Sequence, residues 1–193
     1  MNRRYPRQTG KPAGSVRIIA GEWRGRRLEV ASGADIRPTP DRVRETLFNW
    51  LAPVLPGMYC LDLYAGTGVL GLEALSRGAA ESWFVERDAE AATVLESMLV
   101  RLGGQGRVLR ADTRRWLAGP VSRSFDLVFL DPPYADDELG NLCKLLARGW
   151  LAPHAWIYLE TSRKAQLPAL PEGWQLHRER EAGEVRYALA RLV

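Results

Sequence analysis

The stretch MYCLDLYAGTGVLGLEALSR, residues 58–77, decides the fold because its hydrophobic pattern changes halfway along it. The part up to Leu63 is almost continuously apolar, which is typical of a strand buried on both faces. Glycines follow at positions 66, 68 and 71, and the apolar residues after them recur at helical spacing. A strand, a glycine-rich turn and a helix in succession begin a βαβ unit. The stretch therefore predicts an α/β domain built on a parallel sheet.

The same alternation continues toward the C-terminus. The apolar pattern predicts strands at 58–63, 81–86, 106–110, 125–130 and 155–160. It predicts helices at 68–77, 89–102, 112–118 and 136–149, with Gly78 and Gly103 as stops. Two further strands, 174–180 and 185–192, flank a turn at Gly183 and predict an antiparallel hairpin. We expect a Rossmann-like, seven-stranded, mostly parallel sheet that ends in this hairpin and binds ligands beyond its carboxyl strand ends.

An N-terminal extension precedes this sheet. Alternation from Val16 to Ala20 and a second apolar segment at 28–30 predict a small β-hairpin. The segment RPTPDRVRETLFNWL, residues 37–51, predicts a helix with Thr39 as N-cap and with Arg42 and Arg44 projecting away from its buried stripe. The expected organisation is a flexible basic arm (1–15), a hairpin and helix that contact RNA (16–55), and the main domain (56–193).

Positive charge is concentrated at the start of the chain. The net charge is +4, yet residues 1–50 hold eleven Lys and Arg against five acids, whereas residues 51–193 hold sixteen against eighteen. Clustered cations are what contacts with nucleic-acid phosphates require, although surface arginines also serve solubility. The candidate RNA-binding residues are Arg24, Arg26, Arg27, Arg37 and Arg42.

Composition argues against several other classes. No stretch approaches the roughly 20 apolar residues of a membrane helix, and the N-terminus lacks the apolar run of a secretory signal, so we expect a cytoplasmic protein with no membrane partner. Cys60 and Cys143 have no CxxC spacing, and His154 and His177 are the only histidines, so we expect buried free thiols and no metal site.

The glycine-rich turn is a candidate cofactor site. Gly66, Gly68 and Gly71 let the backbone approach a ligand closely, and Asp62 stands at the strand end before them. Glu86 ends the next strand, where an acid can bind ribose hydroxyls. These features favour an adenosyl ligand. The glycines also satisfy GxGxxG, so a nicotinamide dinucleotide competes with that interpretation, as does an ordinary tight turn.

A second motif, Asp131-Pro132-Pro133-Tyr134, follows the strand 125–130. Two prolines stiffen the backbone, so the Asp131 carboxylate and the Pro132 carbonyl can be fixed acceptors for the hydrogens of an amino group. Tyr134 offers a face on which a base can stack. The motif indicates a site for a base amine, with a polar turn after a core strand as the plain alternative. Asp112 lies at the same sheet edge and is either a cofactor contact or a helix N-cap.

Together these segments resemble a known family. RIIAGEWRGRRLEV, RPTPDRVRETLFNWL, LDLYAGTGVLGLEALSRGA, FVERD and FDLVFLDPPY look like the RsmD-type 16S rRNA guanine-N2 methyltransferases, which are class I enzymes dependent on S-adenosylmethionine. The similarity runs from Val16 through Tyr134. It implies methylation of guanine 966 at N2 within 16S rRNA, in a partly assembled small subunit, by a protein that we expect to be a monomer.

The resemblance also assigns roles to residues. It implies that Asp131, Pro132 and Tyr134 hold the target guanine. The cofactor-binding candidates are Asp62, Tyr64, Gly66, Gly68, Glu86, Arg87, Asp112 and Thr113.

Other functions compete with this one. A DNA adenine-N6 methyltransferase also binds an exocyclic amine, although a duplex-DNA enzyme must flip its base and no insertion here resembles a large recognition region. Protein-glutamine methyltransferases typically have Asn where Asp131 stands. A noncatalytic RNA-binding assembly factor would keep the fold without turnover, and a dehydrogenase would need an acid or base that neither histidine supplies.

Overall fold

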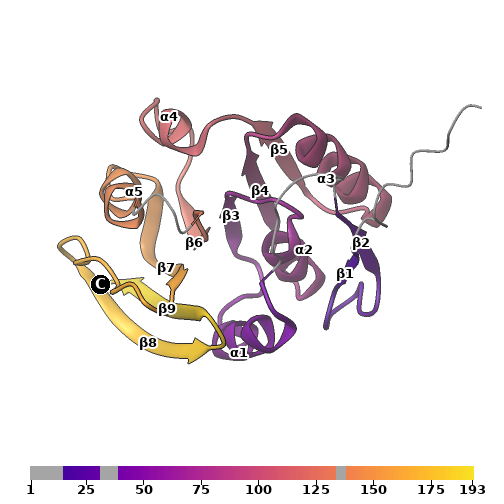
Figure 1. Cartoon of the computed structure of the whole chain (residues 1–193). Helices are drawn as coiled ribbons and strands as arrows, with labels where there is room; N and C mark the ends of the chain where they lie inside the picture. Colours follow the sequence, from indigo (N-terminus) through magenta and orange to yellow (C-terminus); the bar gives the residue numbers. More distant parts are fainter. Residues whose placement is uncertain (1–14, 31–38, 134–137) are drawn as a thin grey trace, which may run out of the picture.

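The computed structural model describes residues 15–30, 39–133 and 138–193. Within these ranges the main sheet has seven strands in the order β5-β4-β3-β6-β7-β9-β8 (Figure 1). The parallel strands are β3 (Tyr59–Leu63), β4 (Glu81–Glu86), β5 (Gly106–Arg110), β6 (Phe125–Leu130) and β7 (Leu151–Ser162). The strands β8 (Trp174–Ala182) and β9 (Val185–Leu192) complete it as an antiparallel hairpin, with β9 paired to β7. The predicted fold class is confirmed.

Helices cover both faces of this sheet. The helices α1 (Asp41–Leu51), α2 (Val69–Ser76) and α3 (Ala89–Leu102) pack in one apolar cluster. The helices α4 (Thr113–Leu117) and α5 (Leu139–Leu146) pack in a second cluster on the opposite face. Successive residues of β3 alternate between the clusters, since Cys60 belongs to the first and Leu61 and Leu63 belong to the second. This two-sided burial explains why the strands are almost continuously apolar.

Local signals set both ends of α3, and the stop at Gly103 was expected from the sequence. The Asp88 carboxylate accepts a hydrogen bond from the Ala91 amide at 2.9 Å, so it caps the helix. Gly103 ends the helix with a φ of +70°. Several boundaries differ from the prediction, and two of the larger differences are at β7 and α5. The strand β7 begins at Leu151 rather than 155, and α5 ends at Leu146 rather than 149 because the chain turns at Gly149, whose φ is +110°.

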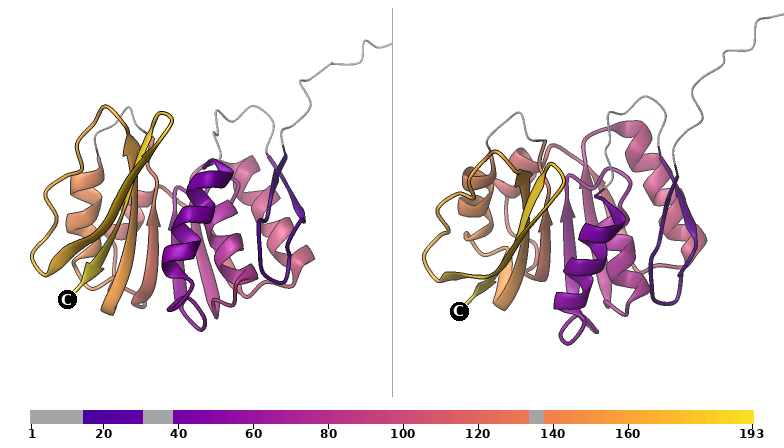
Figure 2. Two further views of the ribbon diagram at one scale, coloured as in Figure 1. Left: turned by 90° about the horizontal axis from the view of Figure 1, so that it is seen from below. Right: turned by 60° about the horizontal axis from the view of Figure 1, so that its bottom comes forward.

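The N-terminal hairpin consists of β1 (Ser15–Arg17) and β2 (Arg27–Glu29). It lies far from the β8–β9 hairpin in both views of Figure 2. The turn after β1 docks on the end of α2, where the amides of Glu22 and Trp23 donate to the Ser76 carbonyl at 2.7 Å and to the Ser76 hydroxyl at 2.9 Å. A Cβ on Gly21 would lie 1.8 Å from that carbonyl oxygen, so only glycine fits there.

Two expectations about α1 are wrong. Pro40, not Thr39, is the N-cap residue, and no side chain caps the helix. Arg44 does not project away from the buried stripe, because it is itself wholly buried. Its guanidinium contacts the Glu73 carboxylate, which is also wholly buried, at 3.4 Å. The helical spacing of apolar residues could not predict the burial of Arg44. In the sequence, an arginine that pairs with a buried acid cannot be distinguished from a surface arginine. Arg42 is exposed as expected.

Candidate functional site

The carboxyl ends of β3 and β6 are neighbours at the centre of the sheet. Leu63 and Leu130, the last residues of these strands, are register partners, so the glycine-rich turn and Asp131 begin side by side. From β3 the chain first builds the sheet toward β5 and then returns to build it toward β8. This is the topological switch point, where open α/β sheets bind their ligands.

Acidic side chains fix the glycine-rich turn. The Glu86 carboxylate accepts hydrogen bonds from the Gly66 amide at 2.7 Å and the Asp88 amide at 2.8 Å. The Asp62 carboxylate accepts one from the Gly71 amide at 2.9 Å. Gly66 has a φ of +53°, which favours glycine. A Cβ on Gly71 would lie 2.3 Å from the Phe84 ring, so this glycine allows close packing of α2 on β4.

The carboxyl group of Asp62 has an unusually high pKa. Its pKa is raised to about 8, mainly by burial and also by the charge of Glu86, while the hydrogen bond from Gly71 opposes the shift. The side chain is nearly inaccessible to solvent. A carboxyl group in this state favours a positively charged ligand, because such a ligand stabilises its ionised form.

Asp131 is only partly buried, and its carboxyl group also has a raised pKa. Burial raises its pKa well above the usual range, and the charges of Glu160 and Asp62 raise it further. A hydrogen bond from the Thr39 side chain lowers it. The next residue, Pro132, is buried. The charges that shift Asp131 are therefore carboxylates, and the site concentrates acceptors and negative charge.

A bridge of polar side chains spans the neighbouring loops. The Tyr64 hydroxyl donates to the Glu138 carboxylate at 3.2 Å, and Arg114 of α4 forms an ion pair with the other oxygen of that carboxylate. Tyr64 itself has a φ of +60°, which is uncommon for a residue other than glycine. Glu138 thus connects the glycine-rich turn to α4, just before α5 begins.

The remaining cofactor candidates lie along the same edge. Asp112 caps α4 by accepting a hydrogen bond from the Arg115 amide at 3.0 Å, which is one of the two roles expected for it. Thr113 is the buried first residue of that helix. Arg87 follows β4 and is exposed. The structure brings the acids at the strand ends together, whereas the Arg87 side chain is exposed to solvent.

Three site residues were missed from the sequence. Thr39 was taken for a cap, and Glu138 stands beyond the motif that drew attention. Glu160 is buried in β7 near Asp131, and the Tyr158 hydroxyl donates to it at 2.6 Å. A lone acid at the end of the apolar run WIYLE was the available signal, because the other strand-end acids lie at the same edge.

The candidate RNA-binding arginines separate into two groups. Arg24, Arg26 and Arg27 are exposed on the N-terminal hairpin, while the neighbouring Trp23 is buried against the core. Arg42 is exposed on α1. The fifth RNA-binding candidate, Arg37, lies outside the described residues, as does Tyr134, which was predicted to hold the target guanine.

Other chemistry finds little support in the described ranges. No group of three or more His, Cys, Asp and Glu side chains there could hold a metal ion. Cys60 and Cys143 are free and buried, as expected. No helix among the described residues has the length and apolar character needed to cross a membrane.

Comparison with known proteins places the chain in a family. Residues 16–191 match the family model described as "Conserved hypothetical protein 95". The ribosomal RNA small subunit methyltransferase D of Escherichia coli strain K12 is 45% identical over 92% of this chain and 90% of its own length. The Haemophilus influenzae protein of the same name is 44% identical over 94% and 96%. The solved structure of Escherichia coli YhhF is 45% identical, covers 93% of this chain and 98% of its own, and has a TM-score of 0.85. The chain belongs to the family of ribosomal RNA small subunit methyltransferase D.

Proposed function

We propose that this protein methylates the exocyclic N2 amine of a guanine in 16S rRNA, at position 966, with S-adenosylmethionine as methyl donor. The observation that carries the proposal is the position of Asp131, which directly follows β6 where β3 and β6 end together and whose carboxyl group is close enough to Asp62 for the charge of Asp62 to raise its pKa. Methyl transfer needs the cofactor and the amine to be bound next to each other. An acceptor for the amine and a glycine-rich turn for the cofactor lie at one switch point, which meets this requirement. Membership of the family supports rRNA as the substrate class.

The residues present fit S-adenosylmethionine. The molecule carries two positive groups, a sulfonium and an ammonium. Asp62 is a buried carboxyl group with a raised pKa, and Glu86 lies close enough to influence it. Gly66 and Gly68 adopt φ values of +53° and +71°, which favour glycine, and a Cβ on Gly68 would lie 2.2 Å from the buried Leu95 side chain, so the turn packs closely on α3. We assign Asp62, Glu86 and the glycine-rich turn to the cofactor, with Tyr64, Asp112 and Thr113 beside them.

When bound, S-adenosylmethionine supplies an electrophilic methyl group. The amine of guanine is a poor nucleophile because its lone pair is delocalised into the ring. Asp131 and the Pro132 carbonyl would accept hydrogen bonds from its two hydrogens, which localises the lone pair and aims it at the methyl group. The proton lost from nitrogen leaves toward these acceptors or solvent. Rigid positioning by two prolines suits this chemistry, which needs no catalytic histidine.

The proposed substrate is rRNA within a partly assembled small subunit, and the proposed enzyme is a cytoplasmic monomer. The exposed arginines of the N-terminal hairpin support contact with a polyanion. The test is to incubate the protein with labelled S-adenosylmethionine and, separately, with naked 16S rRNA, partly assembled small subunits and DNA, and then to map the labelled nucleotide. Label on guanine N2 in RNA is the expected result. Label on DNA adenine would favour an adenine-N6 methyltransferase, and no label anywhere would favour a noncatalytic assembly factor.

Cofactor binding should release protons near neutral pH. With a pKa of about 8, Asp62 is mostly protonated at pH 7 in the free protein. A cationic ligand lowers that pKa, so binding should expel up to about one proton at pH 7 and almost none at pH 9.5. Affinity for S-adenosylmethionine should accordingly rise with pH and level off above about pH 8.

Calorimetry in two buffers of different ionisation enthalpy measures this release directly. Asp62→Asn should bind more weakly and release no proton, whereas Asp131→Asn is the control that keeps Asp62 and should keep most of the release. Equal binding enthalpies in both buffers at pH 7 would reject the role of Asp62.

A further inference from the structure

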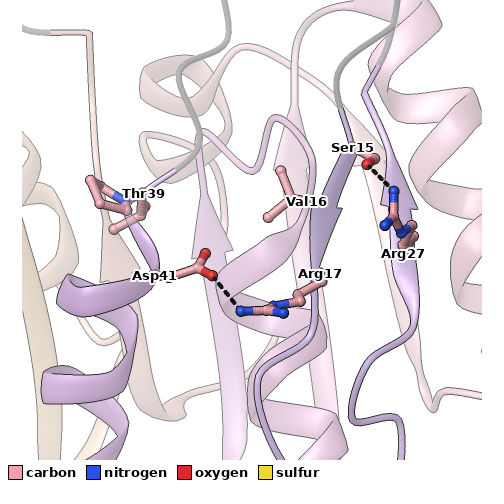
Figure 3. A pocket seen from close by; sticks show the side chains of 7 residues that line it. Ser15, Val16, Arg17, Arg27, Thr39 and Asp41 are labelled. Carbon is pink, nitrogen blue, oxygen red and sulfur yellow. Dashed lines mark hydrogen bonds and ion pairs between the residues drawn. The ribbon is translucent and has the colours of Figure 1, made fainter.

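A groove of about 370 Å³ lies between the N-terminal hairpin and the start of α1 (Figure 3). One wall is the hairpin and the other is the first turn of the helix. It is lined by Ser15, Val16, Arg17, Arg27, Thr39, Pro40 and Asp41. The groove has no part in the cofactor site.

Two cations face this groove from adjacent strands. Arg17 and Arg27 are direct partners in the antiparallel register of β1 and β2, which places their side chains on the same face of the hairpin. Like charges in directly opposite positions repel each other unless an anion lies between or beside them. Asp41 approaches Arg17, with 3.5 Å between the ion-pair atoms, and the Ser15 hydroxyl approaches Arg27 at the same distance. The Arg17 side chain remains 68% exposed, so the pair of cations is open to a further anion.

A single buried guanidinium holds the two walls together. Arg44 donates to the carbonyl of Arg17 on β1 at 3.0 Å and to the carbonyl of Thr39 before α1 at 3.2 Å. It also pairs with the carboxylates of Asp41 and Glu73. The width of the groove is therefore fixed by buried polar contacts, so a ligand meets a preformed site.

The groove leads to the amine site through Thr39. This residue lines the groove, and its side chain hydrogen-bonds to Asp131. Its exposed fraction is only 5%, and it lies between the groove and the amine site at Asp131. Pro40 and Asp41 belong to the start of α1, where the helix dipole is positive and favours an anion.

We propose that this groove binds the RNA phosphodiester next to the target guanine, with Arg17 and Arg27 as its cationic contacts. The proposal rests on the proposed function. A base held at Asp131 leaves its flanking phosphate within about one nucleotide, and the groove with its two cations is the adjoining site. Asp41 holds Arg17 in place in the free protein, and the phosphate would bind between the two arginines. Arg17 was not among the RNA-binding residues expected from the sequence.

The test compares the double variant Arg17→Ala/Arg27→Ala with wild-type protein. A matched control is Arg163→Ala, because Arg163 is also exposed, at 58%, and also paired with one acid, Glu181. The double variant should raise the KM for RNA about tenfold or more and reduce the salt dependence of RNA binding by about one unit of log–log slope. Its kcat at saturating RNA, its affinity for S-adenosylmethionine and its melting temperature should stay close to wild type.

Phosphate ethylation interference then locates the contact. Randomly ethylated RNA is methylated, and the methylated molecules are analysed for positions where ethylation is depleted. Wild-type protein and Arg163→Ala should show depletion at a phosphate flanking the target guanine, and the double variant should lose it. An unchanged interference pattern, or an RNA affinity equal to that of Arg163→Ala, would overturn the groove assignment while the proposed function stands. Failure of wild-type protein to methylate any RNA would overturn both.

Discussion

Asp131→Asn should lower the rate of methyl transfer by roughly 100-fold to 1000-fold, the loss typical of removing one preorganised polar group from an active site. The amide keeps the size of the side chain but replaces one acceptor oxygen with a donor that points at the amine hydrogens. Single-turnover transfer of labelled methyl groups, at saturating cofactor and RNA, measures the chemical step directly. A rate within threefold of wild type would show that Asp131 is not the amine acceptor.

The pH dependence offers a second readout. Burial and the charges of Glu160 and Asp62 raise the pKa of Asp131. Only its ionised form presents both a negative charge and free acceptor oxygens to the hydrogens of the amine. The wild-type rate should therefore fall as pH drops through that raised pKa, and this dependence should be lost or displaced in Asp131→Asn. The variant should melt at or above the wild-type temperature, because it replaces a carboxyl group that lies near the carboxyl groups of Glu160 and Asp62 with a neutral amide.

A matched control lies on the same strand. Asp126 is in β6 at the opposite edge of the sheet, where its carboxylate accepts a hydrogen bond from the Tyr59 amide at 2.8 Å. Asp126→Asn keeps an acceptor oxygen for that amide and should transfer methyl groups at nearly the wild-type rate. The same chemical change at two ends of one strand thus separates catalysis from folding.

Glu73→Ala should destabilise the protein by about 3–5 kcal/mol, the cost of removing one partner from a buried ion pair. The Glu73 carboxylate accepts from the amides of Ile19 at 2.8 Å and Ala20 at 3.0 Å, and it pairs with Arg44 and Arg77. The alanine variant leaves two backbone donors without their acceptor and removes one of the two carboxylates that pair with the buried Arg44 guanidinium, which keeps Asp41. For a chain of this size the melting temperature should fall by about 6–20 °C.

Thermal unfolding measures this loss, and a surface ion pair provides the comparison. Glu29 and Arg101 pair at 3.1 Å with side chains that are 67% and 57% exposed, so Glu29→Ala should cost less than about 1 kcal/mol. If Glu73→Ala does not fold, Glu73→Gln keeps one acceptor oxygen and should show a smaller loss in the same direction. A melting temperature for Glu73→Gln equal to that of Glu29→Ala would contradict the role of Glu73.

The sequence predicted the sheet well because its signals are local. The continuous apolar strands, the glycines at 66, 68 and 71, and the helix stop at Gly103 each act within a few residues. The position of Asp131 after a buried strand was also predictable, since parallel strands share one carboxyl edge.

Long-range polar pairing was not predictable in the same way. Arg44 and Glu73 are 29 positions apart, and each resembles a surface residue until the other is brought beside it. Thr39 was taken for a helix cap because the cap rule considers only its near neighbours, whereas its hydrogen-bond partner Asp131 lies far along the chain. Charged and polar residues whose role depends on tertiary partners are where a single sequence gives the weakest prediction.

The position of β9 has a consequence for biosynthesis. Val185–Leu192 comes after β7 and β8 in the sequence, yet it lies inside the sheet between them, with Ala188 and Ala190 wholly buried. Until these residues leave the ribosome, β7 presents an unpaired edge and β8 has no partner. A nascent chain from which β9 has not yet emerged, or a chain terminated before β9, thus exposes an aggregation-prone edge.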